Sequence, residues 1–177
     1  RSGFLRLRRG LTAAHSPVAA GEGLEAGAAK RRGEGVSIGM LRFTSVAGYQ
    51  PGLIAGLLTR SYAAELSADP QPWQAEAERW QEYDREVFEH PDSVGACIFL
   101  SHFGDKLVGF GSFDPRQGPA LGAVGHNCVL PEYRGRGFGS EQLGEILRRL
   151  RERGIGRAAV STLAGEASLP ARKMYLA

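Results

Sequence analysis

The feature that most constrains this chain is a glycine-rich stretch between an apolar segment and an amphipathic one. The apolar segment covers residues 121–130, and the glycines follow at Gly135, Gly137 and Gly139. After them, apolar side chains recur at the i, i+3, i+4 and i+7 spacing of one helical face, at Leu143, Ile146, Leu147 and Leu150. The pattern predicts a strand, a tight loop and a helix in direct succession.

This strand–loop–helix unit predicts an anion-binding site. Glycine lets the backbone approach a ligand closely and adopts positive φ without strain. The free N–H groups of a helix's first turn point at such a ligand, and the helix dipole favours negative charge there by about 0.3–1 kcal/mol. Arg134 and Arg136 add positive charge beside the loop. A phosphate-bearing ligand therefore fits, and an ordinary glycine-rich turn is the alternative.

The spacing distinguishes between kinds of phosphate-binding loop. A P-loop requires a Lys after its glycines, and none follows here. A dinucleotide-binding loop requires G-x-G-x-x-G, whereas this chain has G-x-G-x-G. Residues 134–139 instead have the form Arg/Gln-x-x-Gly-x-Gly/Ala, preceded by Val-x-Pro-x-x. This stretch resembles the acetyl-CoA motif of the GNAT superfamily of N-acetyltransferases.

The elements expected along the chain follow the order of that family. Apart from the central unit, whose helix extends to Arg153, we expect helices at 51–67, from 73 to about 90 and at 168–176, and strands at 40–45, 97–103, 107–113 and 158–163, with a loop at 114–119. The resemblance implies a mixed α/β sheet with the GNAT acyl-CoA N-acyltransferase fold. Family members normally continue with two more strands, so we expect the C-terminal strands of the sheet to be missing from this chain.

Residues 1–39 differ in composition from residues 40–177, which we expect to form one domain. Residues 1–39 contain eight glycines, seven alanines and seven Lys or Arg against three Glu, which predicts a flexible tail. Because Met40 opens the first expected strand, we expect the natural protein to start there. The alternative is that this tail has a function, because residues 4–9 form a basic amphipathic segment that could touch nucleic acid or a membrane surface. The rest of the chain is close to neutral, so the net charge of +3 does not indicate a nucleic-acid partner.

Other residue types exclude several classes of protein. The sequence contains no run of 18 or more apolar residues, so we expect no segment that spans a membrane. Cys97 and Cys128 both lie in apolar strand-like segments, which favours buried free thiols and a cytoplasmic protein. The histidines are scattered and show no metal-ligand spacing, so we expect no metal.

The resemblance implies where acetyl-CoA binds: in the cleft where the strand before the loop separates from the strand after the helix. Backbone groups of Asn127, Cys128 and Val129 contact the pantetheine and the thioester, and a main-chain N–H, that of Val129, polarises the thioester carbonyl. The pyrophosphate binds mostly to main-chain N–H groups of the loop, which comprises Arg134, Gly135, Arg136, Gly137, Phe138, Gly139 and Ser140.

Two residues are candidates for the catalytic proton transfers. Tyr175 matches the tyrosine that many GNAT enzymes use as general acid, with packing in the last helix as the alternative. Ser168 stands where the family usually has a cofactor-binding Asn. His126 is the candidate base, because histidine transfers protons near neutral pH. Alternation, however, places it on the face of Val124, Cys128 and Leu130, opposite the face on which some family members carry their base. A bulge, common in this strand of the family, would re-aim it.

Several alternatives remain at this stage. His126 could have a purely structural role, in which case an ordered water or Glu89 would act as the base. Trp73, Trp80 and Tyr83 fit either a core or an acceptor pocket. We expect an N-acetyltransferase that transfers acetyl from acetyl-CoA to a small-molecule or peptide amine in a ternary complex, without nucleic-acid or membrane partners. A non-catalytic CoA-binding or CoA-sensing module is the alternative, and a homodimer is common in the family.

Overall fold

The computed structural model describes residues 40–118, 120–161, Lys173 and Tyr175. The strands are β1 Arg42–Thr44, β2 Ile98–Phe103, β3 Lys106–Gly118, β4 Leu121–Val129 and β5 Arg157–Ala159. The helices are α1 Leu53–Ser61, α2 Ala63–Ala68, α3 Pro70–Glu89 and α4 Phe138–Glu152, with short 3-10 turns at η1 Gly95–Cys97 and η2 Pro131–Tyr133.

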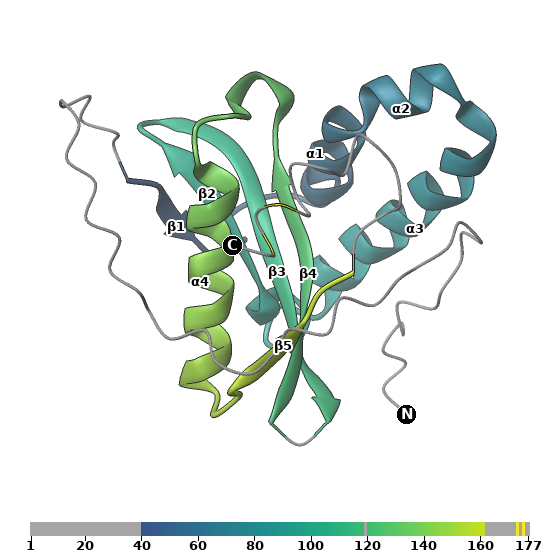
Figure 1. The fold of residues 1–177 in the computed structure, drawn as a ribbon. Coiled ribbons are helices and arrows are strands. Elements are labelled where there is room, and N and C mark those ends of the chain that lie inside the picture. Colours follow the sequence, from purple (N-terminus) through teal and green to yellow (C-terminus); the bar gives the residue numbers. More distant parts are fainter. Residues whose placement is uncertain (1–39, 119, 162–172, 174, 176–177) are drawn as a thin grey trace, which may run out of the picture.

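The strands form one sheet in which spatial order equals sequence order, β1-β2-β3-β4-β5. Neighbours are antiparallel except β4 and β5, which are parallel because α4 connects them. Figure 1 shows α1–α3 on one face of the sheet and α4 on the other. The expected mixed α/β architecture is therefore confirmed.

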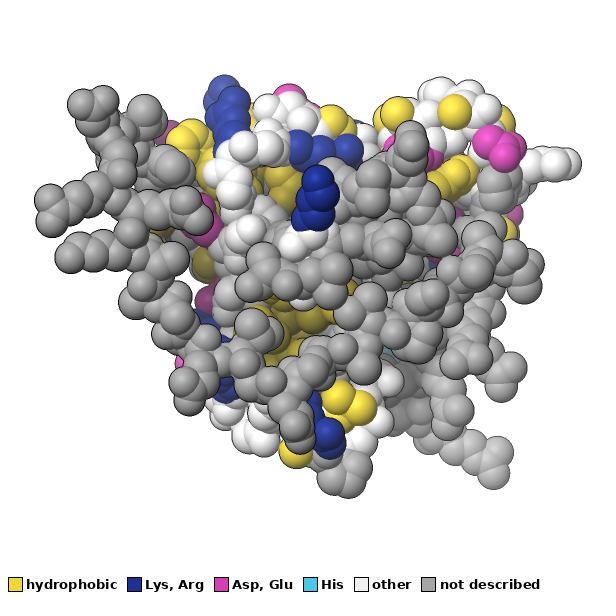
Figure 2. Space-filling view, viewed as in Figure 1, with side chains coloured by type: hydrophobic (Ala, Val, Ile, Leu, Met, Phe, Trp, Pro, Cys, Tyr) yellow, Lys and Arg dark blue, Asp and Glu magenta, His cyan; other side chains and the backbone are white. Residues whose placement is uncertain are grey.

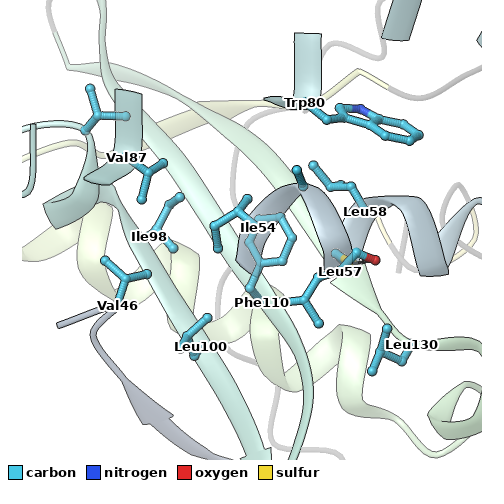
Figure 3. Packing of buried hydrophobic residues seen from close by; sticks show 13 residues of the cluster. Val46, Ile54, Leu57, Leu58, Trp80, Val87, Ile98, Leu100, Phe110 and Leu130 are labelled. Carbon is cyan, nitrogen blue, oxygen red and sulfur yellow. Dashed lines mark hydrogen bonds between the residues drawn. The ribbon is translucent and has the colours of Figure 1, made fainter. Parts of the chain in front are cut away.

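The larger core cluster joins α1 and α3 to the sheet. Ile54 and Leu58 of α1 and Val87 of α3 are fully buried in it; Ile54 lies beside Phe110 of β3, and Val87 lies beside Ile98 of β2 (Figure 3). Their spacing along each helix follows the helical repeat, which explains why these segments are helical and which face they bury. This packing fixes α1 and α3 across the middle of β3 and β4.

On the opposite face, α4 packs through a second cluster. Ile146 and Leu150 contact Phe99 of β2, Phe113 of β3 and Val124 of β4. The apolar stripe expected from the sequence is thus the face that α4 buries. Its N-terminal turn is anchored by the side chain of Phe138, which is 2% exposed.

The first expected helix is divided in two. Instead of one helix to residue 67, α1 ends at Ser61 and α2 begins at Ala63, because the backbone of Tyr62 leaves the helical region. The Tyr62 ring stacks on Trp73 and Trp80, at centroid distances of 5.1 and 5.3 Å. This aromatic packing is a tertiary effect, which helical periodicity alone does not reveal.

The third strand is longer than expected. Residues 114–118, expected in a loop, continue β3 and pair with β4 as far as Gly118 opposite Leu121. Asp114 stabilises this extension, since its carboxylate accepts hydrogen bonds from Arg116 and Gln117. The register is irregular between Asp114 and Gly118, where Pro115 has no N–H to donate.

Candidate functional site

The connection between β4 and α4 presents backbone N–H groups at a helix start. Gly135 and Gly137 adopt left-handed φ values of 76° and 84°, and Gly137 caps α4 without a side-chain hydrogen bond. Ser140 and Glu141 donate their N–H groups to the Gly137 carbonyl. Within the described part of the chain, the N–H groups of Gly135, Arg136 and Gly137 donate to no protein acceptor. These donors are available to an anion.

Beside this loop, β4 has an open edge. β5 pairs with only the first three residues of β4, ending at Ala123, and no other described strand takes its place. On the other edge, Leu130 N–H donates to the Val108 carbonyl at 2.9 Å. Hydrogen-bonded and non-hydrogen-bonded pairs alternate in an antiparallel ladder. The N–H groups of Asn127 and Val129 therefore point away from β3, toward the open edge.

A β-bulge lies in the middle of β4. The register changes between Gly111 and Phe113 of β3, so that Gly125 and His126 together stand opposite Ser112. Ser112 supports the bulge by accepting the His126 N–H at its Oγ, 2.7 Å away. The expected bulge in this strand is confirmed, but it leaves His126 on the same face as Cys128 and Leu130.

The bulge changes which face each side chain of β4 occupies. Strict alternation predicts that Val124 shares a face with His126, Cys128 and Leu130. In the structure Cys128 and Leu130 pack with α1 and α3, whereas Val124 packs with α4. The prediction for Val124 is wrong because the extra residue at the bulge shifts the alternation by one position.

The His126 ring lies on the α3 side of the sheet. Its centroid is 5.3 Å from that of Tyr83 and 5.7 Å from that of Phe110. Burial lowers the pKa of His126 to about 4, so the imidazole is neutral near pH 7. Burial also raises the pKa of Tyr83, whose side chain hydrogen-bonds that of Ser112.

Tyr175 lies against the opposite side of β4. Its side chain hydrogen-bonds that of Asn127, and burial raises the pKa of its phenol. Asn127 in turn donates from Nδ2 to the Gly139 carbonyl in the first turn of α4, at 3.0 Å. The structure thus brings Tyr175 to Asn127 and the loop, but it places the His126 ring on the other face of the sheet.

Arg134 connects the loop to the protein interior. Its Nη2 donates to the Ser61 carbonyl at 2.6 Å and its Nε to the Val129 carbonyl at 3.1 Å. The guanidinium therefore joins the end of α1 to the end of β4. Arg136 is exposed, with its guanidinium 5.5 Å from the Tyr133 ring centroid. Figure 2 shows basic side chains along this upper edge of the molecule, where β4 connects to α4.

Other predicted site residues offer only their backbone. The Phe138 side chain packs in the core with Leu41 and Val108. The Cys128 thiol is buried 2.9 Å from Ser61 Oγ, and its pKa is raised to about 11 by burial. Ser168 lies outside the described residues.

One polar residue at this site was not singled out from the sequence. Gln142 of α4 is completely buried, and its Nε2 donates to Ser101 Oγ at 2.8 Å and to the Cys128 carbonyl at 3.2 Å. Gln142 precedes Ile146 by four residues, which places it on the buried stripe of the helix. A polar side chain on that stripe is the signal that could have identified it.

Among the described residues there is no group of three or more His, Cys, Asp or Glu side chains that could hold a metal ion. None of the helices in residues 40–118 and 120–161 combines the length and apolar composition needed to cross a membrane.

The match to a known protein family covers the strand–loop–helix unit. The model of the acetyltransferase (GNAT) family matches residues 60–177, a range that contains β4, the glycine loop and α4. The chain belongs to the GNAT acetyltransferase family. A comparison with curated proteins found no match.

Solved structures share the GNAT fold of this chain. A protein from Desulfovibrio desulfuricans, described as a GNAT-family acetyltransferase, has a TM-score of 0.59 and 18% identity over 77% of this chain and 82% of its own. A protein from Pyrococcus horikoshii OT3 has a TM-score of 0.56 and 17% identity over 77% and 85%. One from Clostridium acetobutylicum, solved with acetyl-CoA, has a TM-score of 0.52 and 15% identity over 77% and 88%. At these identities the likeness concerns the fold alone.

Proposed function

We propose that this GNAT protein transfers the acetyl group of acetyl-CoA to a primary amine by direct attack in a ternary complex. The observation that carries the proposal is the open edge of β4 beside the glycine loop. Membership of the acetyltransferase family supports it, as does the acetyl-CoA bound to the Clostridium acetobutylicum protein of the same fold.

The loop is the proposed site of the pyrophosphate. The N–H groups of Gly135, Arg136 and Gly137 have no competing protein acceptor within the described residues. They stand at the N-terminus of α4, where the helix dipole favours negative charge. Arg136 is exposed beside them and adds positive charge. An anion bound here would satisfy donors that the described residues leave without an acceptor.

The pantetheine and the thioester are proposed to lie along the open edge of β4. The Val129 N–H points toward this edge and is positioned to polarise the thioester carbonyl. In the reaction the amine nitrogen attacks the carbonyl carbon, and negative charge develops on the carbonyl oxygen. The C–S bond then breaks, and the CoA thiolate leaves.

Tyr175 is the proposed general acid for the leaving thiolate. Its raised pKa keeps the phenol protonated near pH 7, so it has a proton to give. Its contact with Asn127 places it beside the open part of β4. The proton moves from the phenol oxygen to the thiolate sulfur as the C–S bond breaks.

His126 is the candidate base that takes a proton from the substrate ammonium, which leaves the neutral amine that attacks the thioester. Its low pKa makes it neutral and able to accept a proton, but also makes it a weak base at pH 7. An ordered water or the exposed Glu89 is the alternative acceptor of this proton. Replacing His126 with Gln should shift the acidic limb of the pH–rate profile; an unchanged profile excludes it as the base.

Because His126 is a weak base at pH 7, a second function is also a candidate: a CoA-binding or CoA-sensing module without turnover. Thermal unfolding with acetyl-CoA, using ATP and NAD as controls, tests the ligand common to both. At about 100 times the dissociation constant, a ligand of the folded state adds about 2.7 kcal/mol of stability. A shift with acetyl-CoA alone supports the proposed site, and no shift contradicts it. Release of free CoA in a screen of amines then separates enzyme from module.

The role of Tyr175 has its own test in that screen. With an amine that is turned over, Tyr175→Phe should lower kcat by about 100-fold, because the leaving thiolate loses its proton donor. The dissociation constant of acetyl-CoA should stay within about twofold, since the ring is retained. Unchanged kcat excludes Tyr175 as the general acid.

A further inference from the structure

Gln142 is a buried polar side chain that the proposed reaction has not yet used. It lies in the second turn of α4, directly after the turn proposed to hold the pyrophosphate, and it is 0% exposed. Its Nε2 donates to Ser101 Oγ on β2 and to the Cys128 carbonyl on β4. Among the described residues its Oε1 has no hydrogen-bond partner. A buried amide with one unsatisfied oxygen costs stability compared with an apolar side chain of the same shape.

The sheet is shaped to admit this amide. Gly109 of β3 lies between Ser101 and Val129, its register partners on β2 and β4. A Cβ at Gly109 would lie 2.0 Å from the Cys128 carbonyl oxygen and 3.1 Å from Gln142 Nε2. Because a carbonyl oxygen can only accept, the nitrogen of the Gln142 amide must be the atom that faces Cys128.

The contact acts on one particular peptide group. The carbonyl of Cys128 and the N–H of Val129 belong to the same peptide unit. Gln142 donates to its oxygen, while its N–H points to the open edge of β4. A hydrogen bond to the oxygen of a peptide withdraws electron density and makes its N–H a stronger donor. It also holds the peptide plane in one orientation.

We infer that Gln142 is a positioning residue, which orients and polarises the Cys128–Val129 peptide so that its N–H binds the thioester carbonyl of acetyl-CoA. This inference rests on the proposed function. It assigns α4 two tasks: the loop at its N-terminus holds the phosphates, and its second turn tunes the N–H group that binds the carbonyl oxygen on which negative charge develops. It also gives a reason for a half-satisfied amide in the core.

The test uses acetyl-CoA labelled with carbon-13 at the thioester carbonyl and needs no knowledge of the amine. Difference infrared spectroscopy of the bound ligand measures how strongly that carbonyl is polarised. Gln142→Met keeps the shape of the side chain and removes the donor, so the carbonyl band should move to higher frequency, toward that of free acetyl-CoA. Acetyl-CoA affinity should fall by about 3- to 10-fold, and the affinity for CoA, which lacks the carbonyl, should stay within about twofold.

Ser61→Ala is the matched control. It also removes a hydrogen bond to Cys128, but at the thiol instead of the backbone carbonyl. Its carbonyl band should equal that of the wild type. An equal band in Gln142→Met and the wild type overturns the inference while leaving the proposed function intact. If the wild type does not bind acetyl-CoA, the proposed function fails, and the inference fails with it.

A second measurement keeps the test decisive if Gln142→Met does not fold. In the nitrogen-15 NMR spectrum of the wild type, the side-chain amide of Gln142 should shift more with acetyl-CoA than with CoA. Both ligands carry the same phosphates and pantetheine, so the difference reports the acetyl thioester. Equal shifts with the two ligands overturn the inference.

Discussion

Gly137 is the residue at which backbone conformation and charge act together at the proposed phosphate site. A Cβ there would meet open space, but its φ of 84° is one that other residues rarely adopt. We predict that Gly137→Glu weakens acetyl-CoA binding at least about tenfold, because it adds strain and a negative charge where phosphate would bind. Isothermal titration calorimetry measures the change.

Gly144→Glu provides the control for that prediction. Gly144 lies on the exposed side of α4 with open space around it. Its replacement by Glu adds the same negative charge at a position away from the loop. Its acetyl-CoA affinity should stay within about twofold of the wild type. Equal losses in the two variants would mean that the effect is not local to the loop, and no loss in a folded Gly137→Glu would exclude the loop as the site.

His126 should make stability depend on pH. Its pKa is about 4 in the folded protein against an ordinary value of 6.5, so the unfolded chain binds more protons between these values. The neutral His126 ring therefore contributes its full share of the unfolding free energy above about pH 6.5, and this contribution is lost as the pH falls toward 4. We predict that the wild type loses about 2 kcal/mol more of its unfolding free energy than His126→Gln between pH 7 and 4.5.

Urea unfolding of the two proteins at both pH values measures this difference. A residual loss in His126→Gln is expected, because burial and Arg42 also lower the pKa of His102. Equal losses in the two proteins would show that the His126 imidazole is as well solvated in the folded chain as in the unfolded one.

Which site residues the sequence can reveal depends on how local their signal is. The glycines of the loop could be predicted because their spacing is itself the signal, Tyr175 because it matches a tyrosine of the family, and His126 because histidine is suited to proton transfer near neutral pH. Gln142 stands out along the chain only as a polar side chain on the apolar stripe of α4, whereas its contact with Cys128 is made to another strand, beside Gly109. No pattern along a single segment contains that contact.

Among the elements, α1 has an unusual N-terminus, since its cap comes from a different helix. Asp84 of α3 is 3% exposed, and its carboxylate accepts the N–H groups of Gly52, Ile54 and Ala55. The negative charge also opposes the positive end of the α1 dipole. This contact fixes the angle between α1 and α3.

We predict that Asp84→Ala lowers the unfolding free energy by about 2–4 kcal/mol, because it leaves three helix N–H groups unpaired beside the core. Asp69→Ala is the control, since Asp69 occupies the N-cap of α3 but makes no side-chain capping hydrogen bond. It should cost less than about 0.5 kcal/mol. Chemical denaturation measures both, and equal effects would contradict the role given to Asp84.

The end of α3 was predicted well, at about residue 90 against the observed Glu89, but its start was expected at residue 73 and lies at Pro70. Proline can begin the helix because a first helical residue needs no N–H partner. The break at Tyr62 was missed because it depends on stacking against Trp73 and Trp80, which come later in the chain. The extension of β3 was missed because pairing with β4 outweighs the low strand propensity of residues 114–118.

For the whole molecule, the described core extends from Leu41 to Ile155 and is built around one sheet. We predict that deleting residues 1–39 changes the acetyl-CoA dissociation constant by less than about twofold, because the proposed site is formed by β4, the loop and α4. Titration of the full and shortened chains measures this. A larger loss of affinity would assign the N-terminal segment a role at the site.

The order of strands and helices could be predicted because each has its own hydrophobic period, and the family resemblance then supplied the topology. The parallel contact between β4 and β5 follows from the helix that connects them. The point at which β5 stops pairing, Ala123, could not be predicted, because it depends on how two strands diverge in space.

The bulge in β4 also determines how this strand tolerates changes in chain length. Losing one residue from a strand normally turns every later side chain to the wrong face. Here Gly125 and His126 share one partner, and the residues on either side already occupy the faces that a regular strand without Gly125 would give them. Position 125 is therefore where relatives with a β4 one residue shorter can be aligned with a single gap, and with both faces of the sheet unchanged.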